Sequence, residues 1–450
     1  MQIASDARKP TALDRILSLF AEIGAGEGAT ALLLMSNVFI LLTAYYIIKP
    51  VREALILGES GAEIKSYASA GQAALFLIII PLYGALARRV NRVWLINGVI
   101  AIFIANLLLF FALGTLGFSF GVVFYLWAGL FNVMLIAQFW AFANDIYTQA
   151  KGERLFGILG IGAAVGAIFG AFLAGLIFEP VGPYRMMLLS ASLLGISMIL
   201  TNWTHHRESG LISGESAPME KRVEAPKLGS SGGFQLILNS RYLLMIALLV
   251  FISNCVNTTG EFILGKTVAA EAEATVLESG NTADDAVTNY IGQFYSDFFF
   301  WVNLCGAIFQ MFFVSRIMQR FGTGRALLFL PVLAMGAYSL LALIPILGLI
   351  RIAKIAENSA DYSIQNTARH ALFLPTSREA KYKAKAAVDT FFWRAGDSLS
   401  GLLVYIGTQL ALSPRVFAGA NVVLVVIWLS IAVAIIRLLK RGLPDPGNAV

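Results

Sequence analysis

The feature that most constrains this chain is a series of long apolar stretches separated by short polar segments. A helix needs about 20 mostly apolar residues to cross the roughly 30 Å hydrocarbon core of a bilayer. The stretches that meet this requirement lie at 29–48, 67–87, 94–113, 118–143, 155–178, 186–203, 241–264, 290–315, 326–344, 346–373, 386–411 and 416–437. Because 58% of the residues are hydrophobic and only 13% are charged, a water-soluble fold is excluded. We predict an all-α membrane protein with twelve transmembrane helices.

A polar segment at the centre of the sequence divides the apolar stretches into two groups of six. Residues 204–240 are rich in Gly, Ser, Glu, Pro and Lys, which is typical of a flexible linker. The predicted organisation is therefore a cytoplasmic N-terminal segment at 1–28, a six-helix half at 29–203, a cytoplasmic linker at 204–240, a second six-helix half at 241–437 and a cytoplasmic tail at 438–450. From Thr11 the N-terminal segment has the amphipathic pattern of a helix at the membrane surface or of an extension of the first span.

The positive charges follow the predicted loops rather than a surface for nucleic acid. The two termini, the linker and every second loop hold 24 of the 33 Lys and Arg residues. By the positive-inside rule both termini are cytoplasmic, and we expect a multi-pass protein of a bacterial inner membrane in contact with the lipid bilayer. Two parallel six-helix halves joined by a cytoplasmic linker resemble the plan of major-facilitator transporters.

Enzymatic and metal-binding functions find little support in the residue types present. The only cysteines are Cys255 and Cys305, both inside apolar stretches, and the chain has three histidines. These residues form no recognisable zinc motif or catalytic triad. We therefore predict no enzyme activity, no metal and no cofactor, and leave the oligomeric state open.

One literal motif match is interpreted as a coincidence. Residues 260–267, GEFILGKT, fit the pattern of a phosphate-binding loop, which works between a strand and a helix of a soluble nucleotide domain. Here the match falls at the end of a predicted membrane helix. Transport would then depend on a gradient or on exchange rather than on ATP hydrolysis.

Charged residues inside the apolar stretches are the most informative functional signal, since each costs about 2.5–3.5 kcal/mol at a helix centre on insertion scales. The stretch 346–373 places several polar residues on one helical face at steps of three and four. They are Arg351, Lys354, Asn358, Asp361, Gln365 and Arg369. The stripe predicts one wall of a substrate path; alternatively, the helix is peripheral and solvent or neighbours satisfy its charges.

The first predicted span ends in a second group of cations. Tyr45, Lys49 and Arg52 follow at spacings of four and three, and Pro50 predicts a kink between them. The two cations form an anion contact in one interpretation and a snorkelling anchor in the other.

Two helices of the second half carry further polar faces. Residues Asn254, Thr258 and Glu261 share one face, and Asp389, Trp393 and Asp397 share another. Both faces could line a cavity. Alternatively, Lys385 with Asp389 and Arg394 with Asp397 form structural ion pairs within their helix.

A glycine stripe in 155–178 favours close helix packing rather than substrate contact. Gly162, Gly166 and Gly170 repeat every four residues, which lets a second backbone approach closely.

Three segments resemble the ATP/ADP antiporters of plastids and intracellular bacteria: YYIIKPVREAL, FWAFANDIYTQAKGERLFGILGIGAAVG and NTARHALFLPTSREAKYKAKAAVDTFFWRAGD. The resemblance implies that Lys385 and Glu261 match a lysine and a glutamate that are important for nucleotide exchange in that family. Two further positions depart from the family pattern. The resemblance implies a lysine where this chain has Arg52, and a glutamate where it has Gly129.

These observations predict a secondary transporter of an anionic metabolite, with nucleotide exchange by alternating access as the first hypothesis. The alternatives are a proton-coupled transporter of another organic solute, with Asp297 or Glu261 titrating, and a membrane scaffold or sensor without transport activity. The predicted substrate-binding residues are Tyr45, Lys49, Arg52, Glu261, Arg351, Lys354, Asp361, Lys385 and Asp389.

Overall fold

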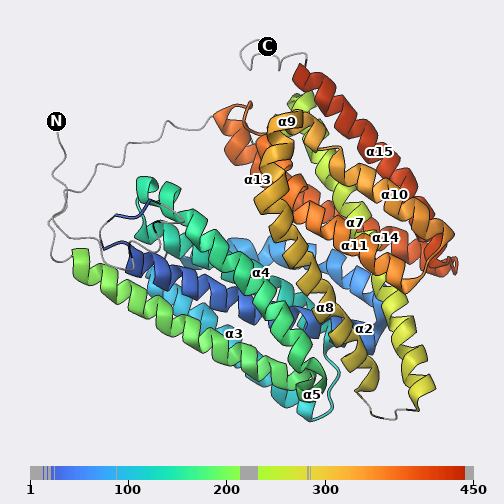
Figure 1. The fold of residues 1–450 in the computed structure, drawn as a ribbon, viewed down its shortest axis with the longest axis horizontal. Coiled ribbons are helices and arrows are strands. Elements are labelled where there is room, and N and C mark those ends of the chain that lie inside the picture. The colour runs from blue at the N-terminus through green and yellow to red at the C-terminus, as the bar shows by residue number, and fades with distance from the viewer. Residues whose placement is uncertain are drawn as a thin grey trace. The chain divides into compact units, whose positions relative to one another are not determined.

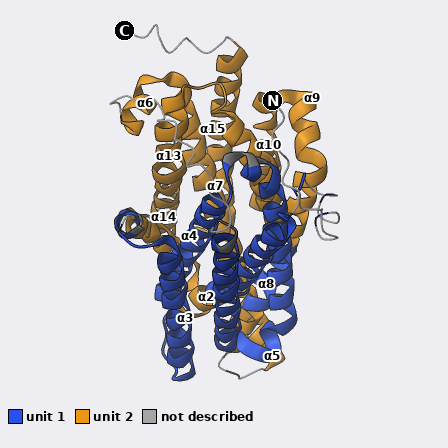
Figure 2. Ribbon diagram, turned by 90° about the vertical axis from the view of Figure 1, so that its left-hand side faces the viewer, with its two compact units in different colours: residues 1–54, 78–222, 292–300 blue, residues 55–77, 223–291, 301–450 orange. Residues whose placement is uncertain are grey.

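All regular structure in the described part of the chain is helical (Figure 1). The computed structural model describes residues 14, 18, 22–24, 26–87, 89–212, 232–280, 283 and 285–440. The helix expected from Thr11 lies almost entirely outside these residues, as does the predicted tail at 438–450 beyond Lys440, where α15 (Pro414–Lys440) ends. The chain divides into two compact units, coloured separately in Figure 2.

The first compact unit consists of residues 1–54, 78–222 and 292–300. It contains most of α2 (Gly28–Ala87), α3 (Arg92–Thr115), α4 (Gly121–Ile146) and α5 (Gln149–Ile212). The predicted glycine stripe of α5 packs against the first half of α2: a Cβ atom added to Gly170 would lie 2.7 Å from the Thr43 carbonyl oxygen, and one added to Gly162 would lie 2.7 Å from Met35. The packing interpretation of this stripe is confirmed.

Two long elements of this unit each contain a pair of predicted spans. In α2 the backbone leaves helical geometry at Gly61, with φ 83°, and in α5 at Gly182, with φ 77°. Glycine adopts positive φ at little cost, so each long element is two helices joined at one residue. The break in α2 lies at Gly61 and not at Pro50, where the backbone stays helical.

The second compact unit consists of residues 55–77, 223–291 and 301–450. Its elements are α6 (Gly233–Asn239), α7 (Arg241–Ser279), α8 (Ala286–Ile308) apart from residues 292–300, η1 (Phe309–Val314), α9 (Ser315–Ala326), α10 (Phe329–Leu343), α11 (Leu347–Ala360), η2 (Asp361–Gln365), α12 (Asn366–Ala371), η3 (Ala380–Ala384), α13 (Lys385–Ala387), η4 (Val388–Phe392), α14 (Trp393–Gln409) and α15 (Pro414–Lys440). The η elements are π-helical turns inside longer helices. Helix α7 is central, because it packs along both α14 and α15.

Seven helical stretches among the described residues are long and apolar enough to cross a membrane. They are Gly28–Leu86, Arg92–Thr115, Gly121–Ile146, Arg154–Ser209, Arg241–Ser279, Ala286–Ala326 and Pro414–Lys440. The all-α, multi-span prediction is confirmed, whereas the count of twelve stays a prediction. Within the range predicted as a linker, α5 continues to Ile212 and α6 covers Gly233–Asn239.

Candidate functional site

The centre of the candidate site is a lysine buried in α11 of the second unit. The Lys354 side chain is 1% exposed, and its Nζ lies 3.0 Å from Glu357 Oε2 and 3.4 Å from Glu261 Oε1. It also donates a 3.0 Å hydrogen bond to Asn257 Oδ1. An isolated ammonium in this position would be strongly destabilised, so these acceptors on α7 and α11 are what allow it to remain charged.

Both carboxylates have further partners. Glu261 accepts a 3.1 Å hydrogen bond from the Asn358 amide and lies 4.0 Å from Lys65 Nζ. Glu357 accepts a 2.8 Å hydrogen bond from the Tyr338 hydroxyl of α10. Two lysines therefore balance two glutamates in one network, which we call the Lys354 network: Lys65, Glu261, Lys354, Glu357 and Tyr338.

A glycine of α7 provides the space for this network. A Cβ atom on Gly260 would clash with the Tyr338 hydroxyl and would lie 3.0 Å from Lys354 Nζ. Gly260 is also the first residue of the motif GEFILGKT, which lies inside the continuous helix α7. Its lysine, Lys266, forms a 2.8 Å ion pair with Glu63. Residues 260–267 therefore do not form a phosphate-binding loop.

A second polar cluster joins α7 to α14. Asp397 Oδ1 accepts 2.8 Å hydrogen bonds from Asn254 and Thr258, and its Oδ2 lies 3.0 Å from Arg394 Nη1. The predicted pairing of Arg394 with Asp397 is confirmed. The α7 face predicted from the sequence therefore contributes to two clusters. Asn254 and Thr258 bind Asp397, whereas Glu261 contacts Lys354.

The Lys385 and Asp389 pair lies nearer the surface. Lys385 Nζ is 3.0 Å from Asp389 Oδ2, and the two side chains are 32% and 27% exposed. This second predicted intrahelical ion pair is also confirmed. A pair so accessible to water contributes little to stability.

The candidate residues of α2 form a cation and aromatic cluster in the first unit. Arg52 is ion-paired with Glu53, and its guanidinium lies 4.9 Å from the centre of the Tyr125 ring. Lys49 Nζ lies 3.9 Å from the centre of the Phe299 ring. Lys49 is buried, so it is not the snorkelling surface anchor of the alternative interpretation.

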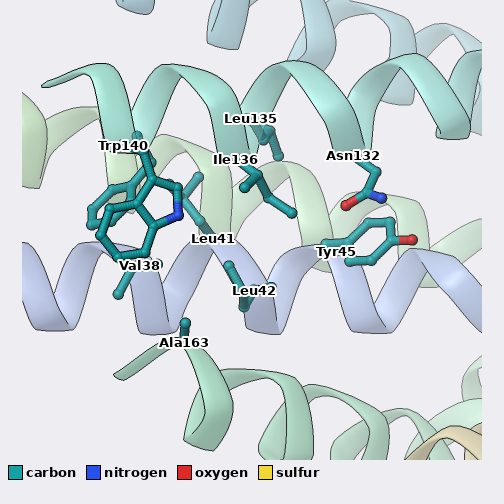
Figure 3. Close-up of a pocket in the computed structure, with 10 residues that line it drawn as sticks. Val38, Leu41, Leu42, Tyr45, Asn132, Leu135, Ile136, Trp140 and Ala163 are labelled. Carbon is teal, nitrogen blue, oxygen red and sulfur yellow. The ribbon is translucent and has the colours of Figure 1, made fainter. Parts of the chain in front are cut away.

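A cavity of about 90 Å³ lies beside this cluster, between α2 and α4 (Figure 3). Tyr45 and Asn132 line one end, and Trp140 lines the other. Most of the remaining lining is aliphatic. The Oδ1 atom of Asn132 is buried and has no hydrogen-bond partner among the described residues, so the cavity offers stacking surface and one open polar group.

Sequence reasoning missed three members of the Lys354 network. Lys65 precedes the second predicted span, which begins at 67, whereas the helix after Gly61 already includes it. Glu357 lies three residues after Lys354, and this i,i+3 spacing is the signal that could have found it. Tyr338 lies in a stretch of apolar residues and gives no signal.

The remaining predicted residues of the stripe do not stay on one regular helical face. Arg351 lies in α11 and is half-buried, whereas Asp361 and Gln365 lie at the two ends of the π-helical turn η2. The wider turn changes the angular spacing beyond residue 360. Arg369, the last residue of the stripe, lies over the Trp393 ring at 4.7 Å from its centre.

Gly129, the position where the resemblance leads one to expect a glutamate, is buried in α4.

Two family models match the chain. Residues 30–356 match the Major Facilitator Superfamily, and residues 332–440 match the TLC ATP/ADP transporter family.

Similar curated proteins include ADP,ATP carriers. ADP,ATP carrier protein 1 of Chlamydia pneumoniae is 24% identical over 348 residues, which cover 68% of this chain and 65% of that protein. ADP,ATP carrier protein 3 of Rickettsia prowazekii is 23% identical over 361 residues, covering 69% of this chain and 66% of the relative. The matched region thus spans just under two thirds of the chlamydial carrier.

Solved structures with a similar fold include several transporters. A point mutant of the nucleoside transporter NupG has a TM-score of 0.62 at 14% identity, and the match covers 89% of this chain and 99% of that one. A bacterial homologue of the iron transporter ferroportin has a TM-score of 0.61 at 13% identity, covering 90% and 98%. At these identities the likeness concerns the fold alone.

Proposed function

The chain belongs to the major facilitator superfamily and is a distant relative of ADP,ATP carriers, and from that premise we propose that it is a secondary transporter of nucleotides. It exchanges an anionic nucleotide across the membrane by alternating access. The proposal includes twelve spans in two six-helix halves, cytoplasmic termini and linker, and a place in a bacterial inner membrane. The match is to transporters and not to enzymes.

The observation that carries the proposal concerns residues 332–440, which match the ATP/ADP transporter family and contain both Lys354 and Lys385. A nucleotide carries several negative charges on its phosphates, so its binding inside a membrane protein requires cations that would otherwise be costly to bury. Lys354 is such a cation, and the carboxylates now beside it are the groups that an incoming phosphate would replace.

The proposed substrate contacts divide by chemistry. Cations neutralise the phosphates, Glu261 and Asp389 hold the cations in place between substrates, and an aromatic residue contacts the base. The cations are Lys49, Arg52, Arg351, Lys354 and Lys385.

Tyr45 is the proposed contact for the base. Its ring lines the cavity of about 90 Å³ together with Trp140 and Asn132. An aromatic ring stacks on any nucleobase, and base stacking is worth about 1–3 kcal/mol per base in single-stranded nucleic-acid complexes.

The proposal is tested by counterflow with the full chain in proteoliposomes. Vesicles loaded with ADP, ATP, another nucleotide or phosphate are given labelled ATP, and uptake above empty vesicles is measured. We expect stimulation by internal nucleotides. Equal uptake in loaded and empty vesicles across the whole panel would contradict nucleotide exchange.

The Lys385→Ala variant should lose most counterflow without losing abundance in the membrane. Its ion pair with Asp389 is partly exposed, so removal costs little stability. The matched control is Lys383→Ala, which removes a second i,i+4 pair of similar exposure, with Glu379 at 3.7 Å. Wild-type uptake in Lys385→Ala, or an equal loss in the control, would remove Lys385 from the site.

A further inference from the structure

Two of the apolar spans among the described residues are much less buried than the others. Only 28% of the most apolar part of Ala286–Ala326 and 22% of that of Pro414–Lys440 is buried, the two lowest shares of the seven spans. Both spans therefore offer broad apolar surface to the acyl chains of a bilayer. The first ends in α9, which contacts α15, the helix that forms the second (Figure 1).

The contact between α9 and α15 is close and lies within the second unit. A Cβ atom added to Gly324 of α9 would lie 3.3 Å from Ile436 Cγ1 and 3.8 Å from Leu439 Cδ1 of α15. At Gly322, with φ 75°, the backbone of α9 leaves helical geometry, and glycine adopts this conformation at little cost. The end of α9 and the last turn of α15 thus form one continuous surface.

Exposed cations gather on this surface, and we call them the basic turn. They are Arg320, Arg325, Arg437 and Lys440. None of the four forms an ion pair with another residue that the structure describes. Residues 298–356 and 398–444, which contain both helices, include no Asp or Glu.

Other cations of the second unit differ in having carboxylate partners. Lys383 Nζ lies 3.7 Å from Glu379 Oε1, and Lys385 Nζ lies 3.0 Å from Asp389 Oδ2. In the basic turn, by contrast, like charges repel one another without an acid to compensate them. An anion bound among these cations would relieve the repulsion, so the surface is suited to an anionic ligand.

Apolar side chains lie next to the basic turn. Phe321 is exposed, and its ring centre lies 5.9 Å from the guanidinium of Arg320. Phe312 and Phe313 of η1, which precedes α9, are also exposed. A surface that is apolar along its helices and cationic at their ends matches the shape and charge of an anionic phospholipid.

We propose that the basic turn binds the headgroups of anionic phospholipids. In the proposed orientation these lipids belong to the cytoplasmic leaflet, whose surface is negatively charged. Arg and Lys bind the phosphate through charge-assisted hydrogen bonds, while the acyl chains lie along the exposed sides of the two spans. A phospholipid is favoured over a soluble nucleotide because both helices border the acyl chains. The inference goes beyond the transport function and does not depend on the solute carried.

The first test measures lipid binding to the purified full chain. Native mass spectrometry follows titrations with phosphatidylglycerol and, separately, with phosphatidylcholine of the same acyl chains. We expect the wild type to bind phosphatidylglycerol at the lower concentration. Each cation near an anionic lipid strengthens binding about fivefold, so the double variant Arg325→Gln, Arg437→Gln should raise the phosphatidylglycerol midpoint about 25-fold.

Two further variants control for net charge and for folding. Arg378→Gln, Lys383→Gln also removes two cations of the second unit, one of them paired with Glu379, and should keep the wild-type midpoint. Arg325→Lys, Arg437→Lys retains both charges of the basic turn and should bind phosphatidylglycerol nearly as well as the wild type.

Several results of the titrations would overturn the proposal. They are equal binding of the two lipids by the wild type, an unchanged midpoint in the glutamine variant of the basic turn, an equal shift in the net-charge control, and a lysine variant as weak as the glutamine variant. Displacement of bound phosphatidylglycerol by ATP or inorganic phosphate at constant ionic strength would assign the surface to soluble anions instead. Absence of nucleotide counterflow would count against the proposed function and not against lipid binding.

A second test examines the full chain in a bilayer. Electron paramagnetic resonance of spin-labelled phosphatidylglycerol and phosphatidylcholine compares the fractions of each lipid that the protein immobilises. The ratio of the two fractions should exceed one in the wild type and fall toward one in Arg325→Gln, Arg437→Gln. It should also fall in 1 M salt, where the Debye length is only about 3 Å. A ratio of one in the wild type would contradict selective binding of anionic lipid.

Discussion

At the scale of single residues, the strongest constraint is the mutual dependence of the groups in the Lys354 network. Lys354 and Glu357 are 1% and 3% exposed, so neither can exchange its partner for water. Removing one member of a buried pair costs about 3–5 kcal/mol, because the other charge is left uncompensated, while replacing both can be nearly neutral.

We therefore expect Lys354→Met to lower the melting temperature of the purified protein strongly, by a destabilisation of about 3–5 kcal/mol. The double variant Lys354→Met, Glu357→Gln should recover most of this loss, since Lys65 still faces Glu261. The measurement is thermal unfolding of the four proteins of the cycle, which are the wild type, the two single variants Lys354→Met and Glu357→Gln, and the double variant. A double variant no more stable than Lys354→Met would refute the pairing.

The residue scale also separates what a sequence can and cannot reveal about the site. Lys354 and Glu261 were identifiable because a charge in an apolar stretch is conspicuous. The 3.4 Å contact between Lys354 Nζ and Glu261 Oε1 could not be identified from the sequence, because it depends on how α7 packs against α11. Tyr338 gave no signal because a tyrosine is common in apolar helices, and only the direction of its hydroxyl assigns it to Glu357.

At the scale of helices, local pattern predicts packing well where small residues set the distance between backbones. The spacing of Gly162, Gly166 and Gly170 was sufficient to predict a close helix contact, although not that the partner is α2. Gly61 and Gly182 lie between predicted spans, in 49–66 and 179–185, so the sequence predicts a break in each region. It does not show that the helix continues on both sides of a single glycine, because only the positive φ of that residue reveals so short a connection.

The contact between α2 and α5 predicts opposite effects for two Gly→Ala changes in α5. At Gly166 a Cβ atom would lie 2.9 Å from Phe39 Cα, so Gly166→Ala must push the helices apart and should reduce both thermal stability and transport. At Gly160 no atom lies within 4 Å of an added Cβ, so Gly160→Ala should be neutral or stabilise by about 0.5–1 kcal/mol. Thermal unfolding compares the Gly166→Ala and Gly160→Ala variants. Equal melting temperatures would contradict a close approach of α5 to α2 at Gly166.

At the scale of the whole molecule, composition and hydropathy were sufficient for the fold class, because backbone groups in lipid must be satisfied within helices. The assignment of segments to compact units was not predictable from the chain order. Residues 55–77 precede the linker yet belong to the second unit, and residues 292–300 follow it yet belong to the first. Such exchanges depend on side-chain packing that hydropathy does not encode.

The proposed orientation predicts which exposed positions face the outside of the cell. Leu277 and Leu374 are both strongly exposed near helix ends, and the charge distribution places them on opposite sides of the membrane. In a chain with Cys255 and Cys305 replaced by alanine, Leu277→Cys should react with an impermeant maleimide in intact cells. Leu374→Cys should react only after permeabilisation; the reverse pattern would invert the orientation.

The membership of residues 55–77 in the second unit has a consequence for how such a chain can diversify. Lys65 and Glu63 meet Glu261 and Lys266 of α7, so the polar segment between the halves is not a neutral crossover point. Consider a hybrid protein that takes residues before the linker from one relative and residues after it from another. In that hybrid, Lys65 and Glu63 would come from one relative and their partners Glu261 and Lys266 from the other. A hybrid that takes residues 55–77 and the second half from the same relative would preserve both ion pairs.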